Sequence, residues 1–186
     1  MKILLQSFVL SFILQWAASA QTAVSEFKRI LLSEKFYSEG ATFADLDGDD
    51  HQDIISGPFW YAGPEFGQRH AYASPRVFAI SGYAAHFFTF VADFNNDTRP
   101  DVLAIPIPGS AAHWFENPGN GKREWEKHLA LSEVSNESPI FEDITGDGKP
   151  ELVCILKGAY GYAVIDPAAA ANPWKFIPIT DNKGYG

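Results

Sequence analysis

The amino-acid sequence predicts an all-β chain built from repeated four-stranded units, and three observations predict it. An Asp-rich stretch recurs three times in 186 residues, and the first acids of successive copies lie 48 and 50 residues apart. Short, apolar, β-prone segments stand before and after each copy. No segment keeps apolar residues at helical spacing for long enough to predict a helix.

The acidic stretches predict tight polar loops between pairs of strands. The three copies are ADLDGDDHQDII (44–55), ADFNNDTRPDVL (92–103) and EDITGDGKPELV (142–153). Each follows an apolar segment (ATFAD, FFTFVAD, PIFED) and leads into another (DIISG, DVLAI, ELVCI). Two β-prone runs separated by a polar loop indicate a hairpin, so each copy contributes two strands.

A second repeated segment keeps step with the loops. Three copies begin 18 residues before the first acid of their loop, and a fourth has no loop after it: FKRILLS (27–33), PRVFAIS (75–81), WEKHLAL (125–131) and WKFIPIT (174–180). An irregular stretch rich in Gly, Pro and aromatic residues separates each hairpin from the next copy. The predicted units are therefore about 27–74, 75–124 and 125–173, with the start of a fourth at 174–186.

The length of these units predicts a β-propeller. Four short strands in about 50 residues are typical of one propeller blade, and repeats of this period indicate propellers or solenoids. A closed ring normally has ~4–8 blades, so about three four-stranded blades predict only a partial β-propeller. We therefore expect this chain to be the N-terminal fragment of a longer propeller.

The acidic loops carry oxygen ligands at positions 1, 3, 5 and 9, and a backbone carbonyl is available at position 7. Such a set suits a hard cation that takes about six to eight oxygen ligands, which predicts calcium; zinc would need His or Cys. The predicted ligands are Asp45, Asp47, Asp49, Asp53 and the His51 carbonyl in the first loop, Asp93, Asn95, Asp97, Asp101 and the Arg99 carbonyl in the second, and Asp143, Thr145, Asp147, Glu151 and the Lys149 carbonyl in the third.

The three predicted calcium sites are unequal. Thr145 is neutral and Glu151 is a methylene longer than Asp, so we expect two to three sites, with the third loop binding most weakly or not at all. Gly48, Gly146 and Gly148 permit the backbone conformations that a tight loop needs. The expected role of calcium is structural, because it would neutralise the carboxylates and fix the turn between two strands. The alternative for any single loop is a solvated turn.

Charge and the N-terminal segment bound the setting. A formal net charge of −9 argues against a nucleic-acid partner, which needs a basic surface. A basic start at 1–2, an apolar run over 3–16 and the small residues at 18–20 predict a signal peptide over 1–20, cleaved after Ala20. The apolar run is shorter than the ~20 residues that cross a bilayer. We therefore expect a secreted or periplasmic mature chain without a membrane span.

The loops, their period and the flanking strands resemble the FG-GAP/VCBS repeat family, whose members form calcium-stabilised β-propellers. The segments GPFWYAGPEFGQRHAYA, FFTFVADFNNDTRPD, WFENPGNG and NESPIFEDITGDGKPELV are similar to exported bacterial VCBS-repeat propellers. They are distantly similar to the propeller of fungal aldos-2-ulose dehydratase, a sugar-eliminating enzyme. The resemblance covers nearly all of residues 27–186 and implies a full-length propeller of about seven blades.

A functional site apart from the calcium loops is expected at the mouth of the propeller channel. Glu39 and Glu137 each precede the first acid of a loop by six residues, and His86 precedes Asp93 by seven. These side chains are candidate acid/base residues, with polar rim residues as the alternative. Three aromatic residues are candidates for stacking on a sugar, with packing inside a blade as the alternative: Trp60, Tyr61 and Trp114.

Two function classes follow from the sequence. The favoured one is an exported, calcium-stabilised propeller that serves as a binding or scaffold module, with a carbohydrate or an extracellular protein as ligand. The alternative is a carbohydrate-active lyase or dehydratase acting on oxidised sugars, in which His86 would work with Glu39 or Glu137. No Ser-His-Asp arrangement, phosphate loop or redox motif is identifiable in the sequence.

Overall fold

The computed structural model describes residues 27–119 and 124–181. Its contacts divide the chain into two units, 1–30 and 31–186. The predicted signal peptide over 1–20 lies outside the described residues. In the first unit, residues 27–30 contain no strand, and every strand belongs to the second unit. Within the described ranges, the helical content is one 3-10 turn, Pro167–Ala169, and no helix is long and apolar enough to cross a membrane.

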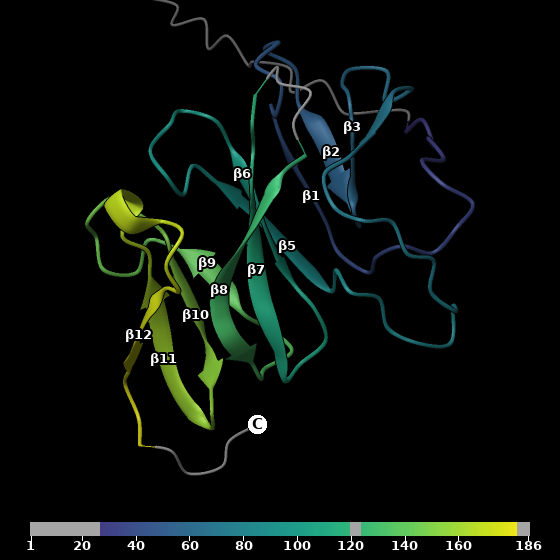
Figure 1. The fold of residues 1–186 in the computed structure, drawn as a ribbon. Helices are drawn as coiled ribbons and strands as arrows, with labels where there is room; N and C mark the ends of the chain where they lie inside the picture. Colours follow the sequence, from purple (N-terminus) through teal and green to yellow (C-terminus); the bar gives the residue numbers. More distant parts are fainter. Residues whose placement is uncertain (1–26, 120–123, 182–186) are drawn as a thin grey trace, which may run out of the picture. The chain divides into compact units, whose positions relative to one another are not determined.

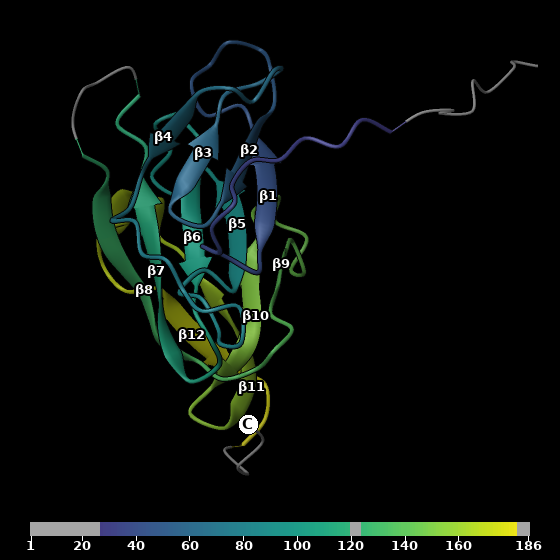
Figure 2. The same cartoon turned by 90° about the vertical axis from the view of Figure 1, so that its right-hand side faces the viewer.

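The second unit consists of three four-stranded antiparallel sheets, each with its strands in chain order (Figures 1 and 2). Sheet 1 contains β1 (Ala41–Ala44), β2 (Asp53–Ser56), β3 (Phe59–Tyr61) and β4 (Arg69–Ala71). Sheet 2 contains β5 (Phe88–Ala92), β6 (Asp101–Ile105), β7 (Ser110–Glu116) and β8 (Glu126–Val134). Sheet 3 contains β9 (Ile140–Glu142), β10 (Glu151–Leu156), β11 (Ala159–Val164) and β12 (Lys175–Pro178). An all-β chain with four-stranded units is thereby confirmed.

The central strand β6 shows how the sheets pack. All five of its residues are buried, because both faces of sheet 2 are covered. Side chains alternate between the two faces of a strand. Val102 and Ala104 accordingly join one apolar cluster with Ile55 of sheet 1, whereas Leu103 and Ile105 join a second cluster that includes residues of sheet 3. Sheet 2 therefore packs between sheets 1 and 3, as neighbouring blades of a propeller do.

Aromatic rings fill the space between sheets 2 and 3. Phe94, in the acidic loop after β5, lies 5.6 Å from Trp114 of β7 and 5.2 Å from Trp174, just before β12, measured between ring centroids. Phe141 of β9 lies 5.9 Å from Phe94. Because large aromatic side chains bury much apolar area, these contacts contribute strongly to holding the two sheets together.

The repeat units read from the sequence are out of phase with the sheets by one strand. WEKHLAL (125–131) lies mostly in β8, the last strand of sheet 2, and WKFIPIT (174–180) contains β12, the last strand of sheet 3. The segment 174–181 therefore completes the third sheet, and the expectation that it starts a fourth unit needs this correction. FKRILLS (27–33) and PRVFAIS (75–81) contain no strand.

Candidate metal-binding loops and a neighbouring pocket

The three acidic loops occupy equivalent places in the three sheets. They join β1 to β2, β5 to β6 and β9 to β10, the first hairpin of each sheet. The backbone is left-handed at positions 4 and 6 of every loop, with φ between 60° and 87° at Gly48, Asp50, Asn96, Thr98, Gly146 and Gly148. The loops therefore share one backbone path even where the residues differ. The sequence indicated this path through its glycines but not through Thr98, a β-branched residue that rarely adopts positive φ.

The first acid of each loop organises the turn through backbone N–H groups. The Asp45 carboxylate accepts hydrogen bonds from the N–H groups of Gly48, Asp49 and Asp50 at 2.7, 3.2 and 3.0 Å. Asp143 accepts bonds from the same three positions of its loop, and Asp93 accepts from positions 5 and 6. Asp favours such turns because its short carboxylate reaches the backbone just ahead of it. These bonds draw the loop around the position-1 carboxylate.

The acid at position 9 braces each loop from within, and in sheets 1 and 2 it also ties the loop to the chain that follows the third strand. Asp53 is 0% exposed, and its two carboxylate oxygens accept bonds from the N–H groups of Leu46 at 2.8 Å and Gly63 at 2.9 Å. Asp101 is equally buried and accepts bonds from Phe94 and Asn117 in the same way. Glu151 accepts bonds from the N–H groups of Ile144 and Thr145 within its own loop. Sequence reasoning treated these residues as metal ligands and missed this bracing role.

Carboxylates converge in the first and third loops. Oxygen atoms of Asp45, Asp47 and Asp49 lie within 4.8 Å of one another. The same holds for Asp143, Asp147 and Glu151, so the longer Glu151 side chain still joins the group in the loop expected to bind most weakly. An oxygen-only set of this kind could hold a hard cation such as calcium.

The second loop is arranged differently. Asn95 stands where the first loop has an acid, and its amide donates to Asp97 at 3.2 Å. Arg99 forms an ion pair with the same Asp97 carboxylate. An arginine paired with this carboxylate would compete with a cation for it, so the second loop offers a cation less net negative charge than the other two.

Ionisation is disfavoured for two of the loop acids in the protein without bound cation. Burial raises the pKa of Asp47, and the neighbouring carboxylates of Asp53 and Asp49 raise it further. Burial raises the pKa of Asp101 to about 7, against the lowering effect of the N–H groups that it accepts from. A nearby cation would favour the charged form of both groups.

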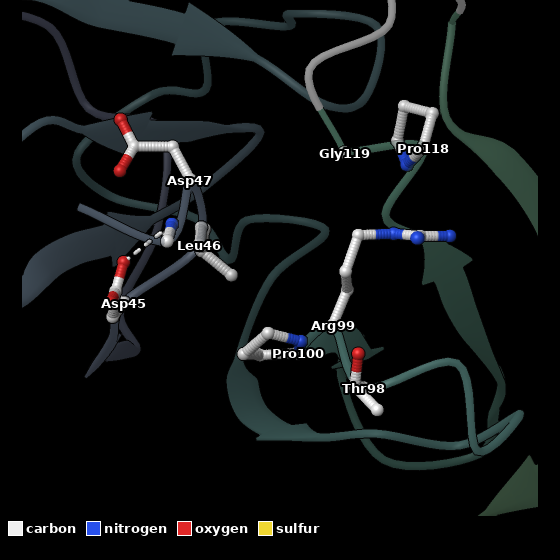
Figure 3. A pocket seen from close by; sticks show the side chains of 9 residues that line it. Asp45, Leu46, Asp47, Thr98, Arg99, Pro100, Pro118 and Gly119 are labelled. Atoms are coloured by element: carbon white, nitrogen blue, oxygen red, sulfur yellow. Dashed lines mark hydrogen bonds between the residues drawn. The ribbon is translucent and has the colours of Figure 1, made fainter. Parts of the chain in front are cut away.

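The first and second loops face each other across a pocket of about 540 Å³ (Figure 3). Asp45 and Asp47 line one side, and Arg99 lines the other, extending below Pro118. The Nε atom of Arg99 donates to the Asn117 carbonyl at 2.9 Å. A structural cation in the first loop would therefore lie beside the boundary between two sheets.

The aromatic candidates are used mainly for packing. Trp114 is 1% exposed and stacks on His128, with ring centroids 4.3 Å apart, and Tyr61 is buried. Trp60 is half-buried and stacks on His70 at 4.2 Å, in the equivalent place of sheet 1. In these contacts, a Trp of the third strand meets a His directly opposite on the fourth strand.

The acid/base candidates are only partly brought together. The Glu39 carboxylate accepts the N–H of Ala84 at 3.0 Å, and the Ser38 hydroxyl donates to the His86 carbonyl at 2.7 Å, so these two segments are joined. Glu137 is exposed, and no hydrogen bond in the described part of the chain connects it to His86 or Glu39. A joint acid/base role for the three candidate residues therefore stays a prediction.

His86 instead lines a second pocket of about 530 Å³, between the end of sheet 1 and the outer strands of sheet 2. Tyr72, Phe115, Trp125 and Lys127 line it as well. Burial lowers the pKa of His86 to about 4, and Lys127 adds to this effect, so the imidazole is neutral at pH 7. Sequence reasoning missed Tyr72, Trp125 and Lys127, because no repeat offset connects them with His86.

One further group of potential metal ligands was not anticipated. Ligand atoms of Glu116, Glu126 and His128 lie within 4.8 Å of one another on β7 and β8, and His128 Nε2 lies 3.2 Å from Glu116 Oε2. The cross-strand register Glu116↔Glu126 brings the two carboxylates together. Only knowledge of this register could have revealed the group.

Comparison with known proteins agrees with the repeated loops and strand pairs. No curated protein and no solved structure matches the chain. The FG-GAP-like repeat family matches residues 59–154, which run from β3 of sheet 1 into β10 of sheet 3. Since the match covers more than half of the 186 residues, the chain belongs to the FG-GAP-like repeat family.

Proposed function

We propose that this chain is an exported, calcium-stabilised segment of a β-propeller that serves as a binding or scaffold module for a carbohydrate or protein outside the cytoplasm. Membership of the FG-GAP-like repeat family and the three four-stranded sheets support the propeller architecture. The composition of residues 1–20 supports export, with cleavage after Ala20. A closed propeller ring normally has ~4–8 blades, so three sheets correspond to a segment of one.

The observation that carries the calcium proposal is the shared geometry of the loops. All three have the same left-handed positions, and in all three the first acid accepts from the N–H groups of positions 5 and 6, although their residues differ. In two of them, three carboxylates converge within 4.8 Å. Carboxylates held this closely repel each other, and a divalent cation bound between them would offset this repulsion through its attraction to each of them.

A calcium titration tests this proposal. We expect calorimetry of the calcium-free mature chain to give two to three binding sites, and saturating calcium to raise the unfolding midpoint by ligand linkage. Asp49→Asn, at an exposed position of the first loop, should remove one site. Magnesium at the same concentration is the control, because its smaller octahedral shell suits these loops poorly. The same melting curve in calcium and in chelator would refute the proposal.

A lyase or dehydratase acting on oxidised sugars is the second candidate. The neutral His86 imidazole at a pocket favours it, because a neutral imidazole can accept a proton. The engagement of Glu39 with Ala84 and the exposure of Glu137 give it less support. His86→Ala in the full-length protein should abolish turnover of an oxidised sugar while calcium binding persists. Unchanged turnover would remove His86 from any mechanism.

A further inference from the structure

The pocket lined by His86 has the composition of a ligand site. Its volume of about 530 Å³ is in the range of small-molecule sites and would accommodate about one or two pyranose rings. It lies where the chain leaving β4 meets β7 and the start of β8, at the boundary of two sheets. It is separate from the pocket between the acidic loops, because the two pockets have no lining residue in common.

His86 supplies an unused polar group to this pocket. The residue is 8% exposed, and its Nδ1 atom is buried with no hydrogen-bond partner in the described part of the chain. Buried polar atoms are nearly always paired, so an unpaired one calls for an explanation. A neutral imidazole carries one donor and one acceptor nitrogen. Nδ1 is enclosed by protein, whereas Nε2 is not among the fully buried atoms without a partner, so Nε2 is the nitrogen that can serve a ligand in the pocket.

The apolar part of the pocket consists of aromatic rings grouped around Tyr72. Its ring lies 5.2 Å from Phe115, 5.5 Å from Trp125 and 6.0 Å from His86, between centroids. The Tyr72 hydroxyl already donates its proton to the Gly57 carbonyl at 2.6 Å, so it is not available as a donor to a ligand. Trp125 is half-buried, which leaves part of its indole surface available to a ligand.

The charges at the pocket balance. Lys127 and Glu124 both line it and are both exposed, and the His86 imidazole is neutral at pH 7. A ligand with a net charge would meet one attractive and one repulsive group. A neutral ligand with several hydroxyls could accept from Lys127, donate to Glu124 and use either role at Nε2.

From this combination we propose that the pocket between β4 and the β7–β8 edge binds one neutral sugar residue, which stacks on Trp125 and hydrogen-bonds to His86 and Lys127. The flat apolar faces suit the C–H surface of a pyranose, and the polar groups suit its hydroxyls. The inference deepens the proposed binding function by naming a site and a ligand class. It does not require any cation in the acidic loops.

The test uses methyl glycosides of glucose, galactose, mannose and N-acetylglucosamine with the mature chain, followed by saturation-transfer NMR and calorimetry. We expect at least one glycoside to bind, and Trp125→Ala and His86→Gln each to weaken that binding at least tenfold. Lys127→Met should also weaken binding, because it removes the proposed hydrogen bond to the sugar. Lys175→Met, at an exposed lysine on sheet 3, is its matched control and should leave binding unchanged. Far-ultraviolet circular dichroism of each variant establishes that it is folded.

Three outcomes would overturn the inference. The first is that no glycoside binds even at a concentration about 50-fold above a millimolar Kd, while the same preparation still responds to calcium. This result would remove the sugar site and leave the calcium proposal intact. The second is binding that Trp125→Ala and His86→Gln both leave unchanged. The third is tighter binding of methyl glucuronide than of methyl glucoside, which would show that Lys127 selects an anion. Loss of the calcium response with glycoside binding retained would count against the calcium proposal alone.

Discussion

The side-chain amide of Asn117 donates a hydrogen bond to the backbone carbonyl of Leu46, 71 residues earlier in the chain, at 2.8 Å. The same nitrogen donates to the Pro100 carbonyl at 3.0 Å, and the amide oxygen accepts from the Gly119 N–H at 2.9 Å. Leu46 belongs to the first acidic loop and Pro100 to the second. One buried amide therefore holds the acidic loops of two neighbouring sheets together.

Asn117→Ala should lower the free energy of unfolding by about 2–4 kcal/mol, because it removes three hydrogen bonds worth about 0.5–1.5 kcal/mol each and leaves buried carbonyls unpaired. Urea denaturation followed by tryptophan fluorescence measures the change. Asn172→Ala, at an exposed position, is the matched control and should have little effect. Equal losses in the two variants would show that the Asn117 amide does not join the sheets.

Asp53 and Asp47 should respond oppositely to removal of their charge. Asp53→Asn should cost about 1–3 kcal/mol in chelator, since an amide can accept only one of the two N–H bonds from Leu46 and Gly63. Asp47→Asn removes one exposed carboxylate from a converging group, so calcium-free stability should hold or rise slightly. Its gain in stability with calcium should shrink. Urea denaturation of both variants in chelator and in calcium provides the measurement, and an equal cost in chelator would contradict the bracing role of Asp53.

His86 should make the protein less stable as pH falls from about 6.5 to about 4. Burial lowers its pKa to about 4 from 6.5, so in this interval the unfolded chain binds a proton that the folded chain does not. The free energy of unfolding therefore rises with pH across this interval, and the contribution of His86 to it no longer changes at higher pH. The two pKa values correspond to a difference of about 3 kcal/mol between the ends of the interval.

The comparison of wild type with His86→Gln isolates this contribution. Both proteins lose stability in acid through their carboxylates, but the variant should lose less between pH 6.5 and 4. Urea denaturation at fixed ionic strength over this range gives the two curves. Parallel curves would mean that the imidazole is equally easy to protonate in the folded and unfolded chains.

Gly161 should tolerate no side chain. A Cβ at this position of β11 would lie 2.3 Å from the Ile177 carbonyl oxygen and 2.6 Å from the Phe176 ring, so the partner strand β12 would have to move. Gly161→Ala should cost about 1–3 kcal/mol or more through this overpacking. Gly67→Ala, where nothing lies within 4 Å, is the control. Thermal denaturation of both variants gives their unfolding midpoints, and equal midpoints would show that the prediction is wrong.

The strand pairs around the acidic loops were predictable from sequence, because apolar runs on both sides of a polar loop are a local signal. The sheet to which WKFIPIT (174–180) belongs was not, since its own β-prone residues do not say which neighbour it pairs with. It pairs with β11 and closes sheet 3. For the same reason, nothing local indicated that Trp114 would be enclosed between sheets.

By itself, the sequence determined the all-β class, the period of the repeats and the carboxylates that converge in the first and third loops, since all of these depend on residues close together in the chain. Tertiary structure alone decided that Asn117 reaches Leu46, that position-9 acids brace the loops, and that His86 meets Trp125 at a pocket. The first and last of these contacts join residues far apart in sequence, and the position-9 acids of the first two loops also reach beyond their own loops, to Gly63 and Asn117. They follow from how neighbouring sheets stack and in what register their strands pair, and spacing along one chain does not encode either directly.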